Sequence, residues 1–338
     1  MTRRLPVYLL LDCSESMVGE PLDLVEAGVH TMISGLKRNP YALETVHMSI
    51  IGFDAKARVI MPLTEVNKVR PPVLSIRPGT ALGAAMDLLA QSIGSDLVKS
   101  TKESKGDYRP LVFILTDGQP TDDWAEAVNR IRGIKPQVAN IYAIGCGGDV
   151  DFETLAKIGD VCIHVKDMNT ESIGKLFVWL TASVQSNSMA PDEPVNLAKA
   201  IPMEPGMEIV DKPPKFTDQK SRLFVHVTCR KTRKPYMIVY RRSPHGGDYH
   251  SQMTVPLPAD FFSDGARKSS PINEQDLNDI PPCPFCQSDG FGKCGFCHHL
   301  FCIDEESAEE PFLVCPVCET RLTASDSGAA FSFDGSVG

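Results

Sequence analysis

The stretch Leu5–Ser16, LPVYLLLDCSES, decides the fold of this chain. From Leu5 to Leu11 the residues form a near-continuous apolar run, as in a parallel strand that is covered on both faces. The run stops at Asp12, after which oxygen-bearing side chains alternate at Ser14 and Ser16. Ligands of open parallel sheets lie at the carboxyl ends of the strands. The stretch therefore predicts a buried strand that leads into a binding loop.

Strand-like and helix-like patterns alternate outward from this stretch. Buried strands are expected at residues 46–53, 111–115, 138–144 and 161–165, and a short antiparallel strand at 57–61. Helices are expected at residues 21–37, 80–97, 122–131, 152–158 and 171–184. The alternation predicts an α/β fold, in which a doubly wound, mainly parallel sheet carries helices on both faces.

The rest of the chain has a different composition. We expect a first domain at residues 1–186, a proline-rich linker at 187–214, a β-rich segment at 215–262, a zinc-binding cysteine cluster at 263–322 and a disordered tail at 323–338. Short strands are expected at residues 223–228, 235–240 and 249–255. The predicted architecture is thus a Rossmann-like domain followed by a small β-rich zinc-binding domain.

Composition narrows the classes of function. No apolar stretch approaches the ~20 residues that a membrane-spanning helix needs, so we expect no membrane partner. The basic and then apolar start is similar to a signal peptide, but the apolar run ends at Asp12 and no small-residue cleavage site follows. The formal net charge of −9 argues against nucleic-acid binding. We expect a cytoplasmic protein.

Three separate loops offer oxygen ligands to one edge of the predicted sheet. Asp12, Ser14 and Ser16 follow the first strand, Thr80 begins a helix in PGTALGAAM, and Asp117 ends a strand in FILTDGQPTD. Each motif alone is typical of a helix cap or a turn. Together they predict a site for one hard divalent ion, Mg²⁺ or Mn²⁺, which prefers oxygen ligands.

These three motifs resemble, in order, the parts of the metal-ion-dependent adhesion site (MIDAS) of von Willebrand A (VWA) domains, over about residues 1–185. The resemblance implies that Ser14, Ser16 and, in one state, Thr80 ligate the metal directly. It implies that Asp12 and Asp117 act through water or hydrogen bonds. It also implies an open coordination position for a carboxylate from a protein partner.

Seven of the eleven cysteines crowd between Cys283 and Cys318. The other four, Cys13, Cys146, Cys162 and Cys229, are scattered. The repeated CxxC spacing is typical of zinc ribbons, and seven thiols with His298 or His299 supply eight ligands for two Zn²⁺ ions. The predicted ligands are Cys283, Cys286, Cys294, Cys297, His299, Cys302, Cys315 and Cys318.

Two pairings of these ligands remain open. In one, the pair 283/286 joins the pair 315/318, and 294/297 join Cys302 and a histidine. In a cross-braced alternative, 283/286 join Cys302 and a histidine, and 294/297 join 315/318. Both pairings give closed four-ligand sites, which are structural rather than catalytic.

The cysteine series and the TDGQPTDDW run together resemble bacterial TerY-type proteins. That resemblance implies a role in tellurite resistance or stress response, with a serine/threonine kinase and a PP2C-like phosphatase as partners. We expect an interaction adaptor without enzyme activity. The alternative is a metal-dependent hydrolase or a ubiquitin-ligase-like enzyme.

A basic stretch adds a weaker hypothesis. Residues 215–242 hold nine Lys or Arg and one acid, Asp218. This pattern is typical of a solvated hairpin, but it also suits docking of a phosphorylated or acidic partner through Arg230, Lys231, Arg233 and Lys234.

Overall fold

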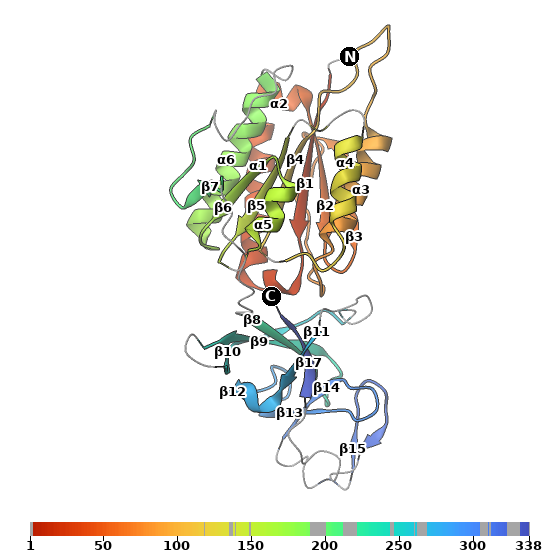
Figure 1. Cartoon of the computed structure of the whole chain (residues 1–338), viewed down its shortest axis with the longest axis vertical. Helices are drawn as coiled ribbons and strands as arrows, with labels where there is room; N and C mark the ends of the chain where they lie inside the picture. The colour runs from red at the N-terminus through yellow and green to blue at the C-terminus, as the bar shows by residue number, and fades with distance from the viewer. Residues whose placement is uncertain are drawn as a thin grey trace. The chain divides into compact units, whose positions relative to one another are not determined.

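The chain folds into two compact units, residues 1–217 and 218–338, which we call the first and second units (Figure 1). The computed structural model describes residues 3–117, 119–134, 138, 140–148, 150–189, 201–211, 222–243, 247–259, 261, 269–304, 310, 312–322 and 332–337. None of the helices in these ranges has the length and apolar character that crossing a membrane requires.

The first unit is built on a seven-stranded sheet with the order β3-β2-β1-β4-β5-β6-β7. Its strands are β1 (Leu5–Asp12), β2 (Val46–Phe53), β3 (Ala57–Glu65), β4 (Leu111–Thr116), β5 (Asn140–Cys146), β6 (Val161–Val165) and β7 (Met207–Ile209). The five inner strands are parallel, and β3 and β7 are antiparallel to their neighbours at the two edges. Every residue of β1 and β4 is buried, as their apolar runs predict.

Helices cover both faces of this sheet, as Figure 1 shows. They are η1 (Glu15–Met17), α1 (Glu20–Lys37), α2 (Pro40–Thr45), α3 (Leu82–Asp96), α4 (Ala125–Gly133), α5 (Phe152–Ile158) and α6 (Thr170–Met189). Helices α3, α4 and α5 share one core with the sheet, whereas α1 and α6 pack against each other. The predicted doubly wound, mainly parallel α/β fold is confirmed.

Two details of the first unit differ from the predictions. Helix α2 lies in a stretch for which the hydrophobic pattern of the sequence predicts neither a helix nor a strand. The predicted linker at residues 187–214 contains β7, which pairs with β6, and its first residues end α6. A three-residue edge strand is too short to show an alternating pattern, which explains the difference.

The second unit is built on an eight-stranded sheet. Its main path is β11-β17-β8-β9-β10-β12, with β14 also pairing with β8, and β13 with β14. The strands are β8 (Arg222–Thr228), β9 (Pro235–Arg242), β10 (Tyr249–Pro256), β11 (Ser269–Asn273), β12 (Leu277–Asn278), β13 (Gly290–Lys293), β14 (Leu300–Ile303) and β17 (Ser332–Val337). A separate two-stranded sheet joins β15 (Leu313–Val314) to β16 (Arg321–Leu322). The three strands expected at residues 223–228, 235–240 and 249–255 are present.

Two features of the second unit differ from the segments expected from the sequence. The β8–β14 pairing places the β-rich segment and the cysteine-rich segment in one sheet, so no domain boundary separates 215–262 from 263–322. The predicted disordered tail contains β17, which pairs with β11 and β8 and buries Phe333 against Phe291. Residues 323–331 and 338 of that tail lie outside the described residues.

Candidate metal sites

The first candidate site begins where β1 ends. Asp12 closes the strand, and its Oδ1 accepts a hydrogen bond of 2.9 Å from the backbone amide of Ser14. Its other oxygen, Oδ2, accepts a hydrogen bond from the hydroxyl of Thr116, the last residue of β4. The Asp12 carboxylate is thus held on one side by its own loop and on the other by the neighbouring strand.

A chain of hydrogen bonds joins this loop to the loop after β4. Ser14 Oγ lies 2.8 Å from Ser16 Oγ, and Ser16 Oγ donates to Asp117 Oδ1 at 2.5 Å. Asp12, Ser14, Ser16 and Asp117 are each at most 6% exposed. The structure therefore brings four of the five predicted oxygen residues together at the carboxyl ends of β1 and β4.

Thr80, the fifth predicted residue, lies in the loop before α3 and is also buried. Its backbone amide donates to the hydroxyl of Thr121 at 3.0 Å, and its carbonyl accepts from the Thr121 amide at 2.8 Å. Thr121 follows Asp117 in the same loop. The second motif, which contains Thr80, is therefore attached to the loop that carries Asp117.

The electrostatics of this site suit a cation. Burial, and next the nearby charge of Asp117, raise the pKa of Asp12 to about 7. Two buried carboxylates beside two hydroxyls form an oxygen-rich cluster in which a hard divalent ion would offset the repulsion between the carboxylates. Cys13 does not compete as a ligand, because its thiol donates to the Leu11 carbonyl and burial raises its pKa to about 12.

The second unit brings eight cysteines together in two clusters. Cluster 1 contains Cys229, Cys283, Cys286 and Cys302, and cluster 2 contains Cys294, Cys297, Cys315 and Cys318. Within each cluster all four sulfur atoms lie within 4.8 Å of one another. Cluster 2 matches the cross-braced pairing, and cluster 1 follows it except for one ligand.

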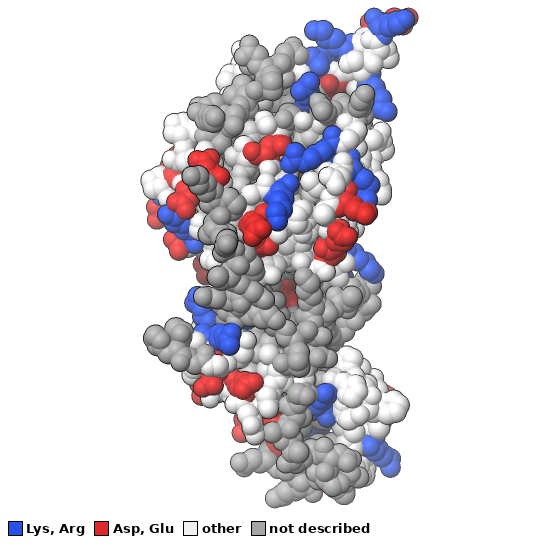
Figure 2. All heavy atoms as spheres, in the orientation of Figure 1, with Lys and Arg blue, Asp and Glu red and all other residues white. Residues whose placement is uncertain are grey.

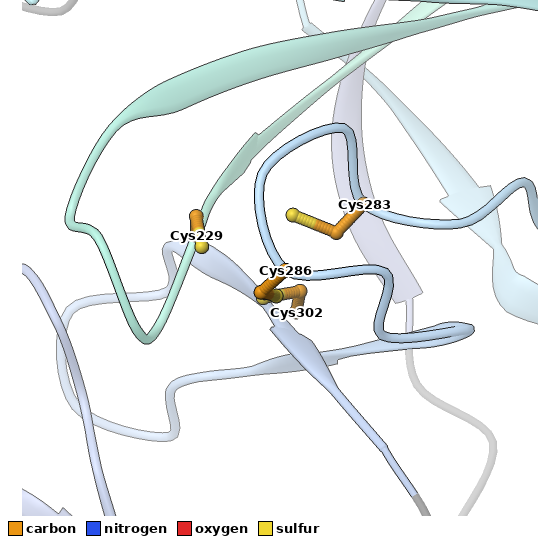
Figure 3. Close-up of side chains that lie close together, drawn as sticks. All are labelled: Cys229, Cys283, Cys286 and Cys302. Atoms are coloured by element: carbon orange, nitrogen blue, oxygen red, sulfur yellow. The ribbon is translucent and has the colours of Figure 1, made fainter.

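That ligand is Cys229, which takes the place predicted for His299. Neither four-residue cluster among the described residues contains a histidine. Cys229 follows β8 in the turn that joins it to β9, and Figure 3 shows it beside Cys283, Cys286 and Cys302. Because β14 pairs with β8, the sheet carries Cys302 to the same end as Cys229.

Cys229 lies in a loop with the backbone geometry of the CxxC loops. In each loop, the amide four residues after the first cysteine donates to that cysteine's carbonyl, and the cysteine's amide donates to the carbonyl five residues after it. The first cysteines of these loops are Cys229, Cys283, Cys294 and Cys315. The fifth residue of each loop has a positive φ between 58° and 64°: Arg233, Gln287, His298 and Glu319.

Each cluster is therefore built from two such loops. Cluster 2 combines two complete CxxC loops. Cluster 1 combines the complete 283–286 loop with the 229 loop, in which Thr232 stands where the second cysteine would be. Cys302 supplies the fourth thiol instead, and its sulfur accepts a 3.2 Å hydrogen bond from the amide of Arg230.

The sulfur geometry fits tetrahedral zinc. Cys286 Sγ lies 3.5 Å from Cys302 Sγ, and in cluster 2 the pairs 294/318 and 297/315 are each 3.6 Å apart. Four sulfurs at about 2.3 Å from one Zn²⁺ ion are about 3.8 Å from each other. Hydrogen bonding of Cys318 with the side chain and then the backbone of Thr320 lowers the pKa of Cys318 to about 6, which favours the thiolate that zinc requires.

The four basic residues predicted as a docking face have partners within the second unit. Both terminal nitrogens of Arg230 bond to the Glu310 carboxylate at 2.8 Å. Lys231 lies 3.3 Å from Asp304, and Arg233 lies 2.9 Å from Glu319. Lys234 lies over the ring of Phe285 at 5.6 Å. These contacts attach the 229 loop to the cysteine-rich segment, which is a structural role that the sequence pattern does not show.

Charges on the first unit are mixed. Figure 2 shows acidic and basic side chains interspersed over its visible described surface, without an extended basic patch on that face. Ion pairs such as Arg130–Asp87 and Lys157–Glu153 account for part of this mixture.

Comparisons with known proteins found a curated relative and several solved structures that are similar to part of this chain. An uncharacterized protein of Synechocystis sp. is 29% identical over 126 residues, a match that spans 35% of this chain and 26% of that protein. The chain therefore covers about a quarter of this curated relative. Solved structures similar to the chain include proximal thread matrix protein 1 from the mussel byssus, at 14% identity and a TM-score of 0.41, covering 54% of this chain and 48% of that chain. The PilB minor pilin of Streptococcus sanguinis is similar at 13% identity and a TM-score of 0.41, covering 55% of this chain and 62% of that chain.

The family model of the von Willebrand factor type A domain matches residues 7–177. The matched range includes β1 from Val7 onward, β2 to β6 and all five residues of the oxygen site. The chain belongs to the von Willebrand factor type A domain family.

Proposed function

We propose that the chain is an interaction adaptor whose first unit holds one Mg²⁺ or Mn²⁺ ion and binds a carboxylate of a protein partner. The metal residues are Asp12, Ser14, Ser16, Thr80 and Asp117. The observation that carries this proposal is the buried hydrogen-bonded chain from Asp12 through Ser14 and Ser16 to Asp117. It holds hydroxyl and carboxylate oxygens in one place before any ligand arrives.

The ion would supply a positive charge with a coordination position open to an outside oxygen. Mg²⁺ and Mn²⁺ prefer about six oxygen ligands, more than these side chains provide directly, so a partner carboxylate completes the shell. The protein's own contribution is preorganisation, since the buried loops order the ligands without further loss of conformational freedom.

The second unit adds two structural zinc sites to this proposal, one in each cysteine cluster. Four thiols close each tetrahedral shell and leave no position for a substrate. The zinc ions would hold the 229 loop and the cysteine-rich segment together, because the strands β12 to β16 are too short to do so alone. This unit would present a second contact surface.

We further propose the cellular setting that the TerY-type resemblance implies. The adaptor would act in a bacterial tellurite-resistance or stress-response system, in the cytoplasm, with a serine/threonine kinase and a PP2C-like phosphatase as partners. The joint presence of the TDGQPTDDW run and the cysteine series in one chain supports this setting.

Substitution of Asp117 tests the proposal. Titration calorimetry with Mn²⁺ should show one binding event in the wild type and none in Asp117→Ala. Asp87→Ala is the matched control, because Asp87 lies on α3 and pairs with Arg130 at the surface of the same unit. Mn²⁺ binding should be unchanged in this control.

Partner capture completes the test. Tagged wild type, Asp117→Ala and Asp87→Ala would be used to purify partners from native cells in buffer with and without Mg²⁺. Omitting Mg²⁺ is preferable to a chelator, because a chelator would also remove zinc from the second unit. A folded Asp117→Ala protein that captured the same partners in the same amounts would exclude the metal bridge.

A further inference from the structure

Thr121 holds Thr80 through two hydrogen bonds. The Thr80 amide donates to Thr121 Oγ1 at 3.0 Å, and the Thr121 amide donates to the Thr80 carbonyl at 2.8 Å. A residue bonded at both backbone groups has little freedom to change its φ and ψ angles. Thr80 is therefore fixed from the β4–α4 loop, which also carries Asp117.

Asp122, the next residue, fixes the helix that Thr80 precedes. Its Oδ1 accepts from the Gly83 amide at 2.9 Å, and its Oδ2 accepts from the Ala84 amide at 2.8 Å. Helix α3 has no side-chain cap from its own N-cap residue, Ala81. Asp122 supplies this cap from a loop 38 to 39 residues away in the chain, and its negative charge also suits the positive end of the helix dipole.

Gly83 leaves the space that this contact requires. A Cβ atom at Gly83 would lie 2.6 Å from the Asp123 carbonyl oxygen and 2.9 Å from Asp122 Oδ2. Both distances are far below van der Waals contact. The glycine therefore allows the loop of residues 121–123 to lie directly on the first turn of α3.

We infer that Thr121 and Asp122 are positioning residues, which we call the bracket, that set Thr80 against Asp117 and so determine the metal affinity of the oxygen site. This inference rests on the proposed metal-binding function. The bracket joins the second and third motifs of the site, while the Ser16–Asp117 hydrogen bond joins the first and third. All three loops are thereby tied together without metal.

Three variants weaken the bracket without replacing a metal residue. Thr121→Val keeps the shape of the side chain but removes the acceptor for the Thr80 amide. Asp122→Ala removes both acceptors for the α3 amides, and Asp122→Asn keeps the shape with one acceptor oxygen. Residues that orient metal ligands typically change affinity by about 10- to 100-fold. We expect the Kd for Mn²⁺ to rise by about that factor in Thr121→Val and Asp122→Ala, and by less in Asp122→Asn.

Asn39→Ala is the matched control. Asn39 caps α2 through the Ala42 amide at 3.0 Å, and α2 precedes β2, at the opposite ends of the strands from the oxygen site. Loss of this cap should lower thermal stability as the Asp122 variants do, yet leave the Kd for Mn²⁺ within about twofold of wild type. Folded Thr121→Val and Asp122→Ala proteins with an unchanged Kd would overturn the inference.

Hydrogen exchange separates this inference from the proposed function. In Mg²⁺-free buffer the amides of Thr80, Gly83 and Ala84 should be protected in the wild type and lose protection in the bracket variants. A wild type that bound no Mn²⁺ would refute the metal-binding function, and the exchange measurement would still judge the bracket. Equal protection in wild type and variants would overturn the bracket.

Discussion

Replacing Cys229 with serine removes one of the four thiols of cluster 1 while leaving every CxxC pair intact. Cys229 is fully buried, and its loop repeats the backbone hydrogen bonds of the three CxxC loops. A serine hydroxyl is a poor zinc ligand beside thiolates. We therefore expect Cys229→Ser to abolish zinc binding at cluster 1 and to spare cluster 2.

The size of the effect follows from the two clusters. Zinc content should fall from two ions to one ion per chain, since each cluster supplies one closed set of four sulfurs. A site occupied at about 1,000 times its Kd stabilises the folded state by about 4 kcal/mol. For a unit of this size, that loss lowers the midpoint of thermal unfolding by about 10–20 °C.

Zinc can be counted by elemental analysis after dialysis, and the unfolding of the second unit followed by circular dichroism. Two controls sharpen the result. His299→Ala should keep two zinc ions, because His299 belongs to neither cluster. Cys162→Ser should also keep two, because Cys162 is buried in β6 of the first unit.

The reverse pattern of zinc contents would exclude Cys229 as a ligand. If Cys229→Ser retained two zinc ions and His299→Ala retained one, the histidine would be the ligand and the loop geometry at Cys229 would have another cause.

Four further predictions follow from contacts described above. Thr232→Cys should restore zinc content from one ion toward two in Cys302→Ser, because Thr232 stands where the other loops have their second cysteine; content that stays at one would contradict the loop equivalence. Without metal, burial and Asp117 raise the folded-state pKa of Asp12 to about 7, above the ordinary value of 3.8. Protonated Asp12 therefore adds its full contribution to the free energy of unfolding below about pH 4, and this contribution is lost as the pH rises through 7. Urea unfolding in Mg²⁺-free buffer should show this loss of stability, and the pH dependence should disappear in Asp12→Asn. Arg230→Glu should lower the thermal stability of the second unit, and the swapped variant Arg230→Glu with Glu310→Arg should recover it, since the two side chains form a bidentate pair; no recovery would mean that the pair is not what Arg230 contributes. Gly28→Ala should cost about 1–3 kcal/mol of unfolding free energy in urea titrations, because its Cβ would lie 2.0 Å from the Phe177 ring of α6; a neutral effect would show that α1 and α6 can separate easily.

The fold of the first unit is largely predictable because its buried strands require long apolar runs in the sequence. Parallel strands covered on both faces must be apolar along their whole length, so β1 and β4 are visible as unbroken runs. The polar residues that end those runs then mark the ligand edge, which is why Asp12 and Asp117 are found without any knowledge of contacts. Short or half-exposed elements such as β7 and α2 show no comparable pattern of apolar residues in the sequence.

The second unit is less predictable because its ligands come from distant segments. Cys229 lies 54 residues before Cys283 in the chain and has no second cysteine in its loop, so its spacing alone carries no zinc signal. One signal was available: seven cysteines leave two four-ligand sites one thiol short, and Cys229 sits in a turn between two predicted strands. The pairing of β14 with β8, which unites the thiols, depends on long-range register that local patterns do not show.

β17 illustrates a similar difficulty. Its sequence, SFDGSV, is rich in small and polar residues that are typical of a disordered segment. Its pairing with β11 and β8 and the burial of Phe333 are tertiary effects that override composition.

The four left-handed residues of the cysteine loops suggest a route to altering the second unit by design. Arg233, Gln287, His298 and Glu319 all carry side chains at a φ near +60°, where a Cβ atom is disfavoured by about 1–2 kcal/mol. Glycine at these positions relieves that strain, although it increases the entropy of the unfolded chain. Where the relieved strain exceeds that entropy, glycine substitution would make the loops easier to form without zinc. At Arg233 and Glu319 the same substitution would also remove the ion pair that joins their two loops.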